Sequence, residues 1–210
     1  MLAILRTAGW LLAIMLSTVP SFWFLVHPHA EYWRSRRGAR FRILGPLWIA
    51  MWLAVGVIAW PWRHVVLYDD AFFWLAAVPF FAAGLYLYYR GRASFRFEQL
   101  IGRPEVQGDK FEQRLVTTGI RARVRHPVYL GHLCELIGWS LGTGLAVIYV
   151  LTGFAIVTGA VMIHMEDDEL ERRFGESFRQ YRKATPAVIP RLVARAVNPA
   201  SRSYEPKANG

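Results

Sequence analysis

Long apolar runs alternate with short basic segments along this chain. The first run extends from Leu2 to Val26, the second from about Ile43 to Trp62, and the third from about Ala71 to Tyr89. A helix rises about 1.5 Å per residue and the apolar core of a bilayer is about 30 Å thick, so each run can cross a membrane. The pattern predicts three membrane-spanning helices in the first 89 residues.

A fourth apolar stretch, from about Val128 to Met165, is too long for one crossing. Gly142-Thr143-Gly144 lies in its middle and predicts a turn. We therefore expect a helical hairpin with legs 127–141 and 145–165. The first leg would rise only about 20 Å, so it either begins earlier or turns inside the bilayer. The runs together predict an all-α integral membrane protein with about five transmembrane helical segments.

Basic residues are concentrated in the segments that connect these runs. The first such segment carries Arg34, Arg36, Arg37, Arg40 and Arg42. The segment from 90 to 125 and the C-terminal segment after the hairpin are also basic, whereas the connection containing Asp69-Asp70 is not. Positive charge favours the cytoplasmic side, so we expect a cytoplasmic C-terminal segment in a bacterial-type inner membrane, with Asp69-Asp70 on the opposite side.

Composition supports this class and argues against others. The 210 residues are 54% hydrophobic and include 9 Trp, 13 Phe and 9 Tyr. The net charge of +10 falls in blocks between apolar runs, which suits anionic lipid and does not favour nucleic acid. The single cysteine, Cys134, excludes a disulfide within the chain, and no ligand spacing predicts a metal site. Residues 1–196 are expected to form one domain and 197–210 a disordered tail.

Two polar groups flank the hairpin. Arg125-His126-Pro127 precedes its first leg, and Glu166-Asp167-Asp168-Glu169 follows its second leg. Proline suits the first turn of a helix, whose unpaired N–H groups together with Arg125 would hold a carboxylate. The hairpin would bring both groups to the same membrane face, with Glu166 roughly 10 Å deeper into the cytoplasm than His126. Interfacial anchoring and a solvated helix end are the alternatives for the two groups.

Glu135 is a further candidate because a carboxylate in the middle of a span is costly. It indicates either a functional role or a buried partner, for which His132 and Ser140 are the candidates. The histidines near other span ends, His27, His29 and His64, are expected to be interfacial.

Two motifs carry a family resemblance. Leu115 to Gly119 followed by Arg125-His126-Pro127-Val128-Tyr129-Leu130-Gly131 resembles the signature of the membrane-embedded isoprenylcysteine carboxyl methyltransferase and phospholipid methyltransferase superfamily. The closing motif of that superfamily is similar to Glu166-Asp167 with Leu170, Phe174-Gly175, Tyr181 and Pro190. The chain departs from the pattern at Ile120, where an aromatic is usual, and at Asp167, where a second Glu is usual.

The resemblance implies that residues 90–196 bind S-adenosylmethionine and that a lipophilic acceptor enters from the bilayer. It implies cofactor contacts from His126, Pro127, Tyr129, Gly131, Glu166 and Asp167. Arg125 and Glu166 would be the catalytic residues, and Arg125 would hold the carboxylate of either the cofactor or the acceptor. Glu135 would contact the acceptor, and Glu135 or Glu166 would serve as base for an amine.

The acceptor stays open at this point. A carboxylate of an isoprenylcysteine-like compound is favoured, and a small lipophilic acid, a thiol or a phospholipid amine are the alternatives. A non-catalytic lipid-binding or assembly protein is the rival outside the enzyme class. The oligomeric state is not indicated by the sequence.

Overall fold

The described residues of this computed structural model, 2–29, 32–33, 40–92 and 115–190, form a helical bundle. Its helices are α1 (Leu2–Val26), α3 (Arg40–Ala59), α4 (Phe72–Arg92), α7 (Pro127–Thr143), α8 (Ala146–Phe174) and α9 (Glu176–Ala184). Two short 3-10 helices, η1 (Trp60–Trp62) and η3 (Gly119–Ala122), join them. Within these ranges the predicted all-α class is confirmed, since no strand forms there.

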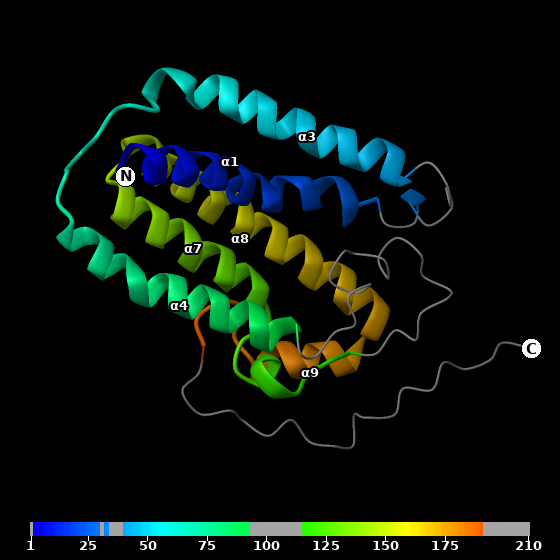
Figure 1. Ribbon diagram of the computed structural model, residues 1–210. Coiled ribbons are helices and arrows are strands. Elements are labelled where there is room, and N and C mark those ends of the chain that lie inside the picture. Colours follow the sequence, from blue (N-terminus) through cyan, green and yellow to red (C-terminus); the bar gives the residue numbers. More distant parts are fainter. Residues whose placement is uncertain (1, 30–31, 34–39, 93–114, 191–210) are drawn as a thin grey trace, which may run out of the picture.

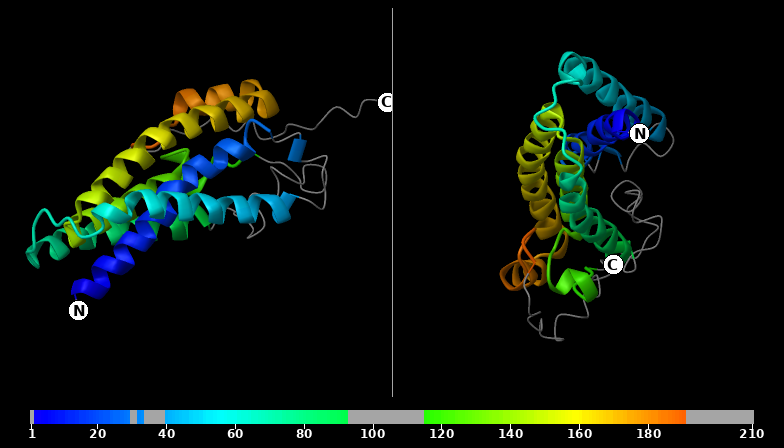
Figure 2. Two further views of the ribbon diagram at one scale, coloured as in Figure 1. Left: turned by 90° about the horizontal axis from the view of Figure 1, so that it is seen from above. Right: turned by 60° about the vertical axis from the view of Figure 1, so that its left-hand side comes forward.

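The hairpin of α7 and α8 is the centre of the bundle. Helix α4 packs along α7, α1 packs along α8, and α3 packs on the outside of α1 (Figure 1). The main core cluster joins the hairpin to α1 and α3: its members include Trp10 and Ile14 of α1, Ala59 of α3, Leu136 of α7, and Ile148 and Leu151 of α8. In both views of Figure 2, α9 (orange) lies at the end of α8 remote from the hairpin turn.

The predicted hairpin turn is confirmed. Helix α7 ends at Gly144, whose φ of 65° lies in the left-handed region that favours glycine. The turn is also tied to the 65–68 connection, since Leu67 N donates to Gly144 O at 2.8 Å and Ala146 N donates to Val65 O at 3.0 Å. A side chain at Gly144 would meet the carbonyl of Tyr68. Both the backbone conformation and the packing therefore require glycine here.

Within the described ranges, four helices are long and apolar enough to cross a membrane: 2–26, 42–62, 72–91 and 146–174. Large apolar side chains such as Leu53, Val57 and Val157 point outward, whereas the small polar side chains of Ser140 and Thr152 are buried and hydrogen-bonded to each other. This arrangement suits a lipid surround. Helix α7 has 17 residues, or about 25 Å, so the fifth crossing stays a prediction, as does the orientation of the C-terminal segment.

Glycines on α7 let α4 approach closely. Gly131 faces Tyr88, Gly138 faces Phe81 and Gly142 faces Trp74, and an added Cβ at each would lie within 2.6 to 2.9 Å of the facing ring. Aromatic rings of α4 therefore fill the spaces that the glycines leave. Small residues at helix interfaces are a common means of close packing in membranes.

This packing predicts that Gly138→Leu destabilises the protein by about 1–3 kcal/mol, because the new side chain must displace Phe81. Gly153→Leu is the control, since Gly153 lies in a helix with nothing within 4 Å of the added Cβ. Thermal unfolding in detergent, followed by circular dichroism, measures both. Leucine has the higher helix propensity, so equal behaviour of the two variants would contradict the packing account.

Candidate active site

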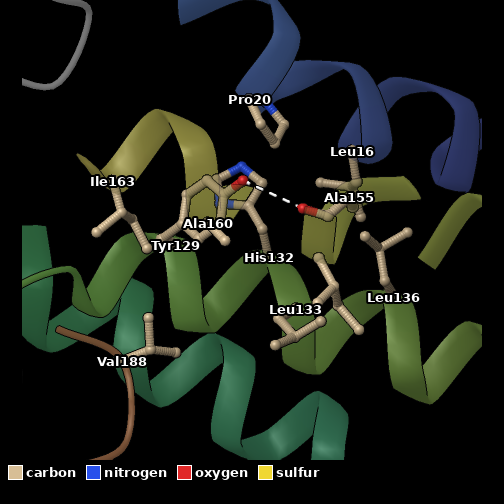
Figure 3. Close-up of a pocket in the computed structure, with 11 residues that line it drawn as sticks. Leu16, Pro20, Tyr129, His132, Leu133, Leu136, Ala155, Ala160, Ile163 and Val188 are labelled. Carbon is tan, nitrogen blue, oxygen red and sulfur yellow. Dashed lines mark hydrogen bonds between the residues drawn. The ribbon is translucent and has the colours of Figure 1, made fainter. Parts of the chain in front are cut away.

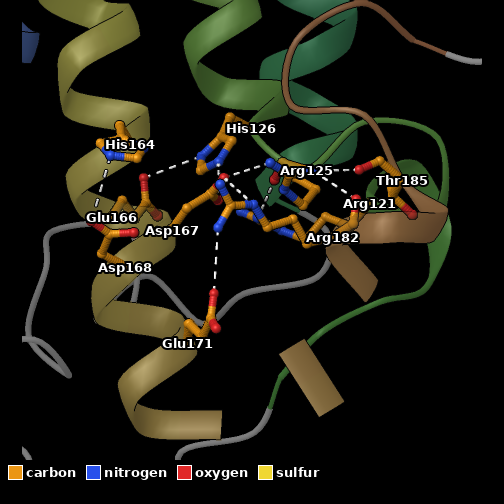
Figure 4. Close-up of polar contacts among 10 residues, drawn as sticks. All are labelled: Arg121, Arg125, His126, His164, Glu166, Asp167, Asp168, Glu171, Arg182 and Thr185. Atoms are coloured by element: carbon orange, nitrogen blue, oxygen red, sulfur yellow. Dashed lines mark hydrogen bonds and ion pairs between the residues drawn. The ribbon is translucent and has the colours of Figure 1, made fainter. Parts of the chain in front are cut away.

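The hairpin places the two predicted polar groups in direct contact (Figure 4). His126 Nδ1 lies 3.1 Å from Glu166 Oε2, and His126 Nε2 lies 3.1 Å from Asp167 Oδ1. The prediction that the groups share one end of the hairpin is confirmed, and the predicted separation of roughly 10 Å is wrong. Helix α7 extends to Thr143 and α8 begins at Ala146, so the legs differ by only about 5 Å of helical rise, which the side chains bridge.

Asp167 is the centre of this polar network. Its carboxylate accepts from Arg125 NH2 at 2.5 Å and lies 3.7 Å from Arg182 Nε, in addition to its contact with His126. The residue is only 3% exposed. A buried carboxylate must be compensated, and here three cations from two segments do so.

The same network binds the backbone of the segment that follows α9. Arg125 NH1 donates to the carbonyl oxygen of Thr185. The backbone N–H groups of Arg125 and His126 donate to Pro186 O at 2.9 Å and Ala187 O at 3.0 Å. The terminal nitrogens of Arg125 are thus directed to Asp167 and to backbone carbonyls, and its predicted role toward a cofactor or acceptor carboxylate stays a prediction.

A second set of contacts joins η3 to α9. Tyr181 Oη donates to Arg121 O at 2.7 Å, and Arg121 NH1 donates to Arg125 O at 2.8 Å. Burial raises the pKa of Tyr181 to about 12, so its phenol is a permanent donor at neutral pH. This explains the position of Tyr181 in the closing motif. Pro190, from the same motif, is exposed at the end of the described segment.

His126 is charged at neutral pH. Burial lowers its pKa, but the carboxylates of Glu166 and Asp167 outweigh burial and raise that pKa to about 9. Both ring nitrogens therefore donate. The two acids differ in access, because the side chain of Glu166 is 29% exposed and that of Asp167 is 4% exposed. Glu166 is thus the anion of this pair that a ligand can reach.

An apolar cavity of about 150 Å³ lies between α1, α7 and α8 (Figure 3). Tyr129 and Val188 line it, three residues after His126 and one residue after Ala187, which accepts from His126 N. Leu16 and Pro20 of α1 and Leu136 of α7 also line it. Tyr129 Oη donates to Ala155 O at 3.4 Å across to α8. A Cβ at Gly159 would overlap this hydroxyl, so glycine is needed there for Tyr129 to reach α8.

The remaining predicted residues have structural positions. Pro127 is buried in the first turn of α7, and Gly131 packs against Tyr88, so neither position tests the predicted cofactor contacts. The carboxylate of Glu135 lies against Gly84 of α4. The two candidate partners of Glu135 are wrong, because the hydrogen bonds of both side chains go elsewhere: His132 Nδ1 bonds Val128 O at 2.8 Å, and Ser140 Oγ bonds Leu136 O at 2.8 Å and Thr152 Oγ1 at 3.0 Å.

Sequence reasoning missed a second buried pair beside the site. His27, expected to be interfacial, is 7% exposed, and its Nδ1 lies 2.6 Å from Glu169 Oε2. Glu169 follows Glu166 by three residues and so shares its helical face, which indicates that a cation must face it. Nothing local identified the cation as a residue at the end of α1. Arg182 and Thr185 were missed for the same reason.

Metal ligation finds no support in the part of the chain that the structure describes. No group of three or more His, Cys, Asp or Glu side chains is placed there to hold an ion.

Asp167→Asn is predicted to lower the free energy of unfolding by about 3–5 kcal/mol, because Arg125 would keep its buried charge without its carboxylate partner and His126 would keep only Glu166. Asp168→Asn is the matched control, since the Asp168 side chain is 51% exposed and its contact with His164 is 3.7 Å long. Chemical unfolding in detergent measures both. A loss of similar size in the two variants would contradict the central position of Asp167.

The charge of His126 predicts a pH dependence. Its folded pKa of about 9 exceeds the ordinary value of 6.5, so its contribution to stability is complete below about 6.5 and is lost as pH rises through about 9. The stability difference between the wild type and His126→Gln should therefore shrink between about pH 7 and pH 10. Thermal unfolding across this range checks it, and a constant difference would exclude a charged His126.

Comparisons with known proteins agree with the motifs. Methanethiol S-methyltransferase 2 of Bradyrhizobium diazoefficiens is 27% identical over 160 residues, covering 71% of this chain and 52% of that protein. Protein-S-isoprenylcysteine O-methyltransferase of Schizosaccharomyces pombe is 33% identical over 118 residues, covering 55% and 48%. The nickel-cobalt-cadmium resistance protein NccN of Alcaligenes xylosoxydans xylosoxydans is 42% identical over 81 residues, covering 37% of each chain.

The chain thus spans about half the length of the first two relatives and less of the third. No solved structure matches it. Residues 73–177 match the family described as phospholipid methyltransferase, a segment that contains Arg125, His126, Tyr129, Glu166 and Asp167. Because this match covers half of the chain, the protein belongs to the phospholipid methyltransferase family.

Proposed function

We propose that this protein is an integral membrane methyltransferase that moves a methyl group from S-adenosylmethionine to a lipophilic acceptor. The observation that carries the proposal is the contact between a charged network and an apolar cavity. Tyr129 and Val188 line the cavity, and each lies within one turn or one residue of a network member. A charged cofactor and an apolar acceptor need two such environments side by side.

The residues present fit the cofactor. Its ammonium and ribose hydroxyls need an accessible anion, and the partly exposed carboxylate of Glu166 is one. Its carboxylate needs donors, and two buried polar atoms in the network, Arg125 Nε and Thr185 Oγ1, have no hydrogen-bond partner among the described residues. A buried donor without a partner is costly, so a ligand that satisfies it gains affinity. Asp167 would act behind these groups by holding Arg125 and His126 in place.

S-adenosylmethionine supplies an electrophilic methyl group on a sulfonium. The protein's part in such a displacement is to align the acceptor and exclude water. The apolar walls of the cavity would exclude water, and the phenol of Tyr129, held to Ala155 O, would fix the boundary between cavity and network. Glu166 would place the cofactor, and its negative charge favours a bound sulfonium.

The names of the relatives bear on the acceptor. One relative is named for methanethiol and another for protein isoprenylcysteine, and the family is named for phospholipids. A thiol, an isoprenylcysteine-like carboxylate and a phospholipid amine are accordingly the three acceptor classes. The proposed site faces the cytoplasm of a bacterial-type inner membrane. Its support is that the ends of α1 and α4 and the start of α3, which border the basic segments, lie at the same end of the bundle as the network (Figure 1).

A non-catalytic lipid-binding protein on the same scaffold is the rival, and binding of S-adenosylmethionine separates the two. Glu166→Gln is predicted to weaken this binding about ten- to a hundredfold, the loss expected for one charge-assisted hydrogen bond. Glu176→Gln is the control, because Glu176 is exposed on α9 and pairs only along that helix with Arg179. Isothermal titration of purified protein with the cofactor measures the affinities.

Thermal unfolding of the same samples tests whether Glu166→Gln keeps its fold despite losing the carboxylate that faces His126. Binding that is unchanged in this variant would remove Glu166 from the cofactor site. No binding to the wild type would favour the lipid-binding rival.

A further inference from the structure

We propose that His132 is the proton acceptor for an apolar thiol held in the cavity between α1, α7 and α8. This inference rests on the proposed methyl transfer and names the acceptor class for it. His132 lines the cavity on α7 (Figure 3) and follows His126 by six residues. No part of the polar network includes it.

The hydrogen bonding of His132 fixes where its lone pair lies. Its Nδ1 is 2.8 Å from the carbonyl oxygen of Val128, which can only accept, so Nδ1 carries the proton. In a neutral imidazole the other nitrogen, Nε2, is then an acceptor. Among the described residues the ring of His132 forms one hydrogen bond, through Nδ1, and Nε2 forms none. A neutral imidazole with an open lone pair is suited to take a proton from a ligand.

The surroundings of His132 keep it neutral until it takes that proton. The titratable groups packed on the ring are two phenols, Tyr88 edge-on from α4 and Tyr129 from α7. The cavity residues contributed by α1 and α8 are apolar: Leu16, Pro20, Ala155, Ile156, Ala160 and Ile163. Glu135, one turn further along α7, lies against Gly84 instead. An isolated imidazole in such walls favours its uncharged form.

These features select a thiol over the other two acceptor classes. A cysteine thiol has an ordinary pKa of about 8.5, and a simple alkanethiol ionises less readily, so a thiol enters an apolar cavity uncharged at neutral pH and must lose one proton to become a strong nucleophile. An alkyl ammonium would have to lose its charge first. A carboxylate is already ionised, has no proton to give Nε2, and meets the anion Glu166 at the network end. The terminal nitrogens of Arg125 and the ring of His126 are directed to Asp167, Glu166 and backbone carbonyls.

The step balances without a further reactant. The thiol S–H bond breaks and its proton goes to His132 Nε2, while the sulfur lone pair forms a bond to the methyl carbon. The bond between that carbon and the sulfonium breaks, and its electron pair stays on the cofactor sulfur. One positive charge moves from the sulfonium to the imidazolium, so the net charge inside the apolar site does not change. The proton leaves to water after the product is released.

Cavity size limits the part of the acceptor that is enclosed. A cavity of about 150 Å³ in another protein holds benzene, so this one of about 150 Å³ encloses roughly six carbons. Ile156 and Ala160 line the cavity but are exposed on the outside of α8, so a longer tail would have to leave past them. The probes are therefore hexanethiol, hexanoic acid and hexylamine, which share chain length and differ in the reacting group.

The experiment uses the full chain in lipid nanodiscs with labelled S-adenosylmethionine. Methylation of hexanethiol should exceed that of the acid and the amine. His132→Gln should slow hexanethiol methylation about a hundredfold or more at neutral pH, the usual contribution of a general base. The loss should shrink as pH approaches the thiol pKa, and it should be small for benzenethiol, which ionises more readily. His164→Gln, at an exposed histidine of α8, is the control and should match the wild type.

Two readouts do not depend on turnover. Cofactor affinity should be equal in the wild type and His132→Gln, and nitrogen NMR of labelled histidine in the cofactor-free protein should show His132 as the Nδ1–H tautomer that responds to hexanethiol and not to hexanoic acid. Faster methylation of hexanoic acid than of hexanethiol, or an unchanged rate in His132→Gln, would overturn the inference while leaving the methyltransferase intact. Absence of cofactor binding in the wild type would instead remove the proposed function. Should His132→Gln lose its cofactor affinity, the wild-type ranking of the three probes decides alone.

Discussion

The buried carboxylate of Asp167 is the constraint on which the functional end of the molecule depends. It sits on α8 and is held by Arg125 and His126 ahead of α7 and by Arg182 of α9. A buried charge needs an opposite charge next to it. These segments must therefore pack so that the carboxylate of Asp167 meets its cationic partners. The position of the chain after α9 is fixed by the same arginine, because Arg125 binds both Asp167 and the carbonyl oxygen of Thr185. The anion thus assembles a site from residues more than forty positions apart.

The adjacent acids Glu166 and Asp167 of α8 have different environments because successive side chains of a helix point in different directions. Successive residues point about 100° apart, so Asp167 turns into the protein while Glu166 stays accessible at the edge of the network. His126 contacts both, and its charge binds the structural anion and the accessible one together. Replacement of the usual second Glu by Asp at 167 is consistent with this division, because a shorter side chain suffices for a contact made inside the protein.

Local sequence patterns predicted the start of α7 and the turn of the hairpin, because proline and glycine determine the backbone conformation at those positions. Pro127 and Gly144 bound α7, and the glycine turn returned Glu166 and Asp167 to His126. The predicted separation of Glu166 and His126 was too large because the end of α7 was predicted two residues too early. At about 1.5 Å of rise per residue, such an error amounts to several ångströms. Long-range partners were not predictable from one sequence: His27 for Glu169, and Gly84 rather than His132 or Ser140 next to Glu135. Each depends on how α1 and α4 pack on the hairpin, which the hydrophobic pattern alone does not specify.

The packing of α4 and α1 connects the scaffold to the chemistry. Tyr88 of α4 fills the space at Gly131 and places its edge on His132, so the same contact that seats α4 also supports the cavity wall. On the other side, α1 closes the cavity with Leu16 and Pro20 and ends in His27, whose pairing with Glu169 holds that helix against α8. Apart from His132 and Tyr129, the side chains that line the cavity are therefore apolar. A reaction that begins with one cation and ends with one cation suits such a site, because it does not change the net charge between the apolar walls.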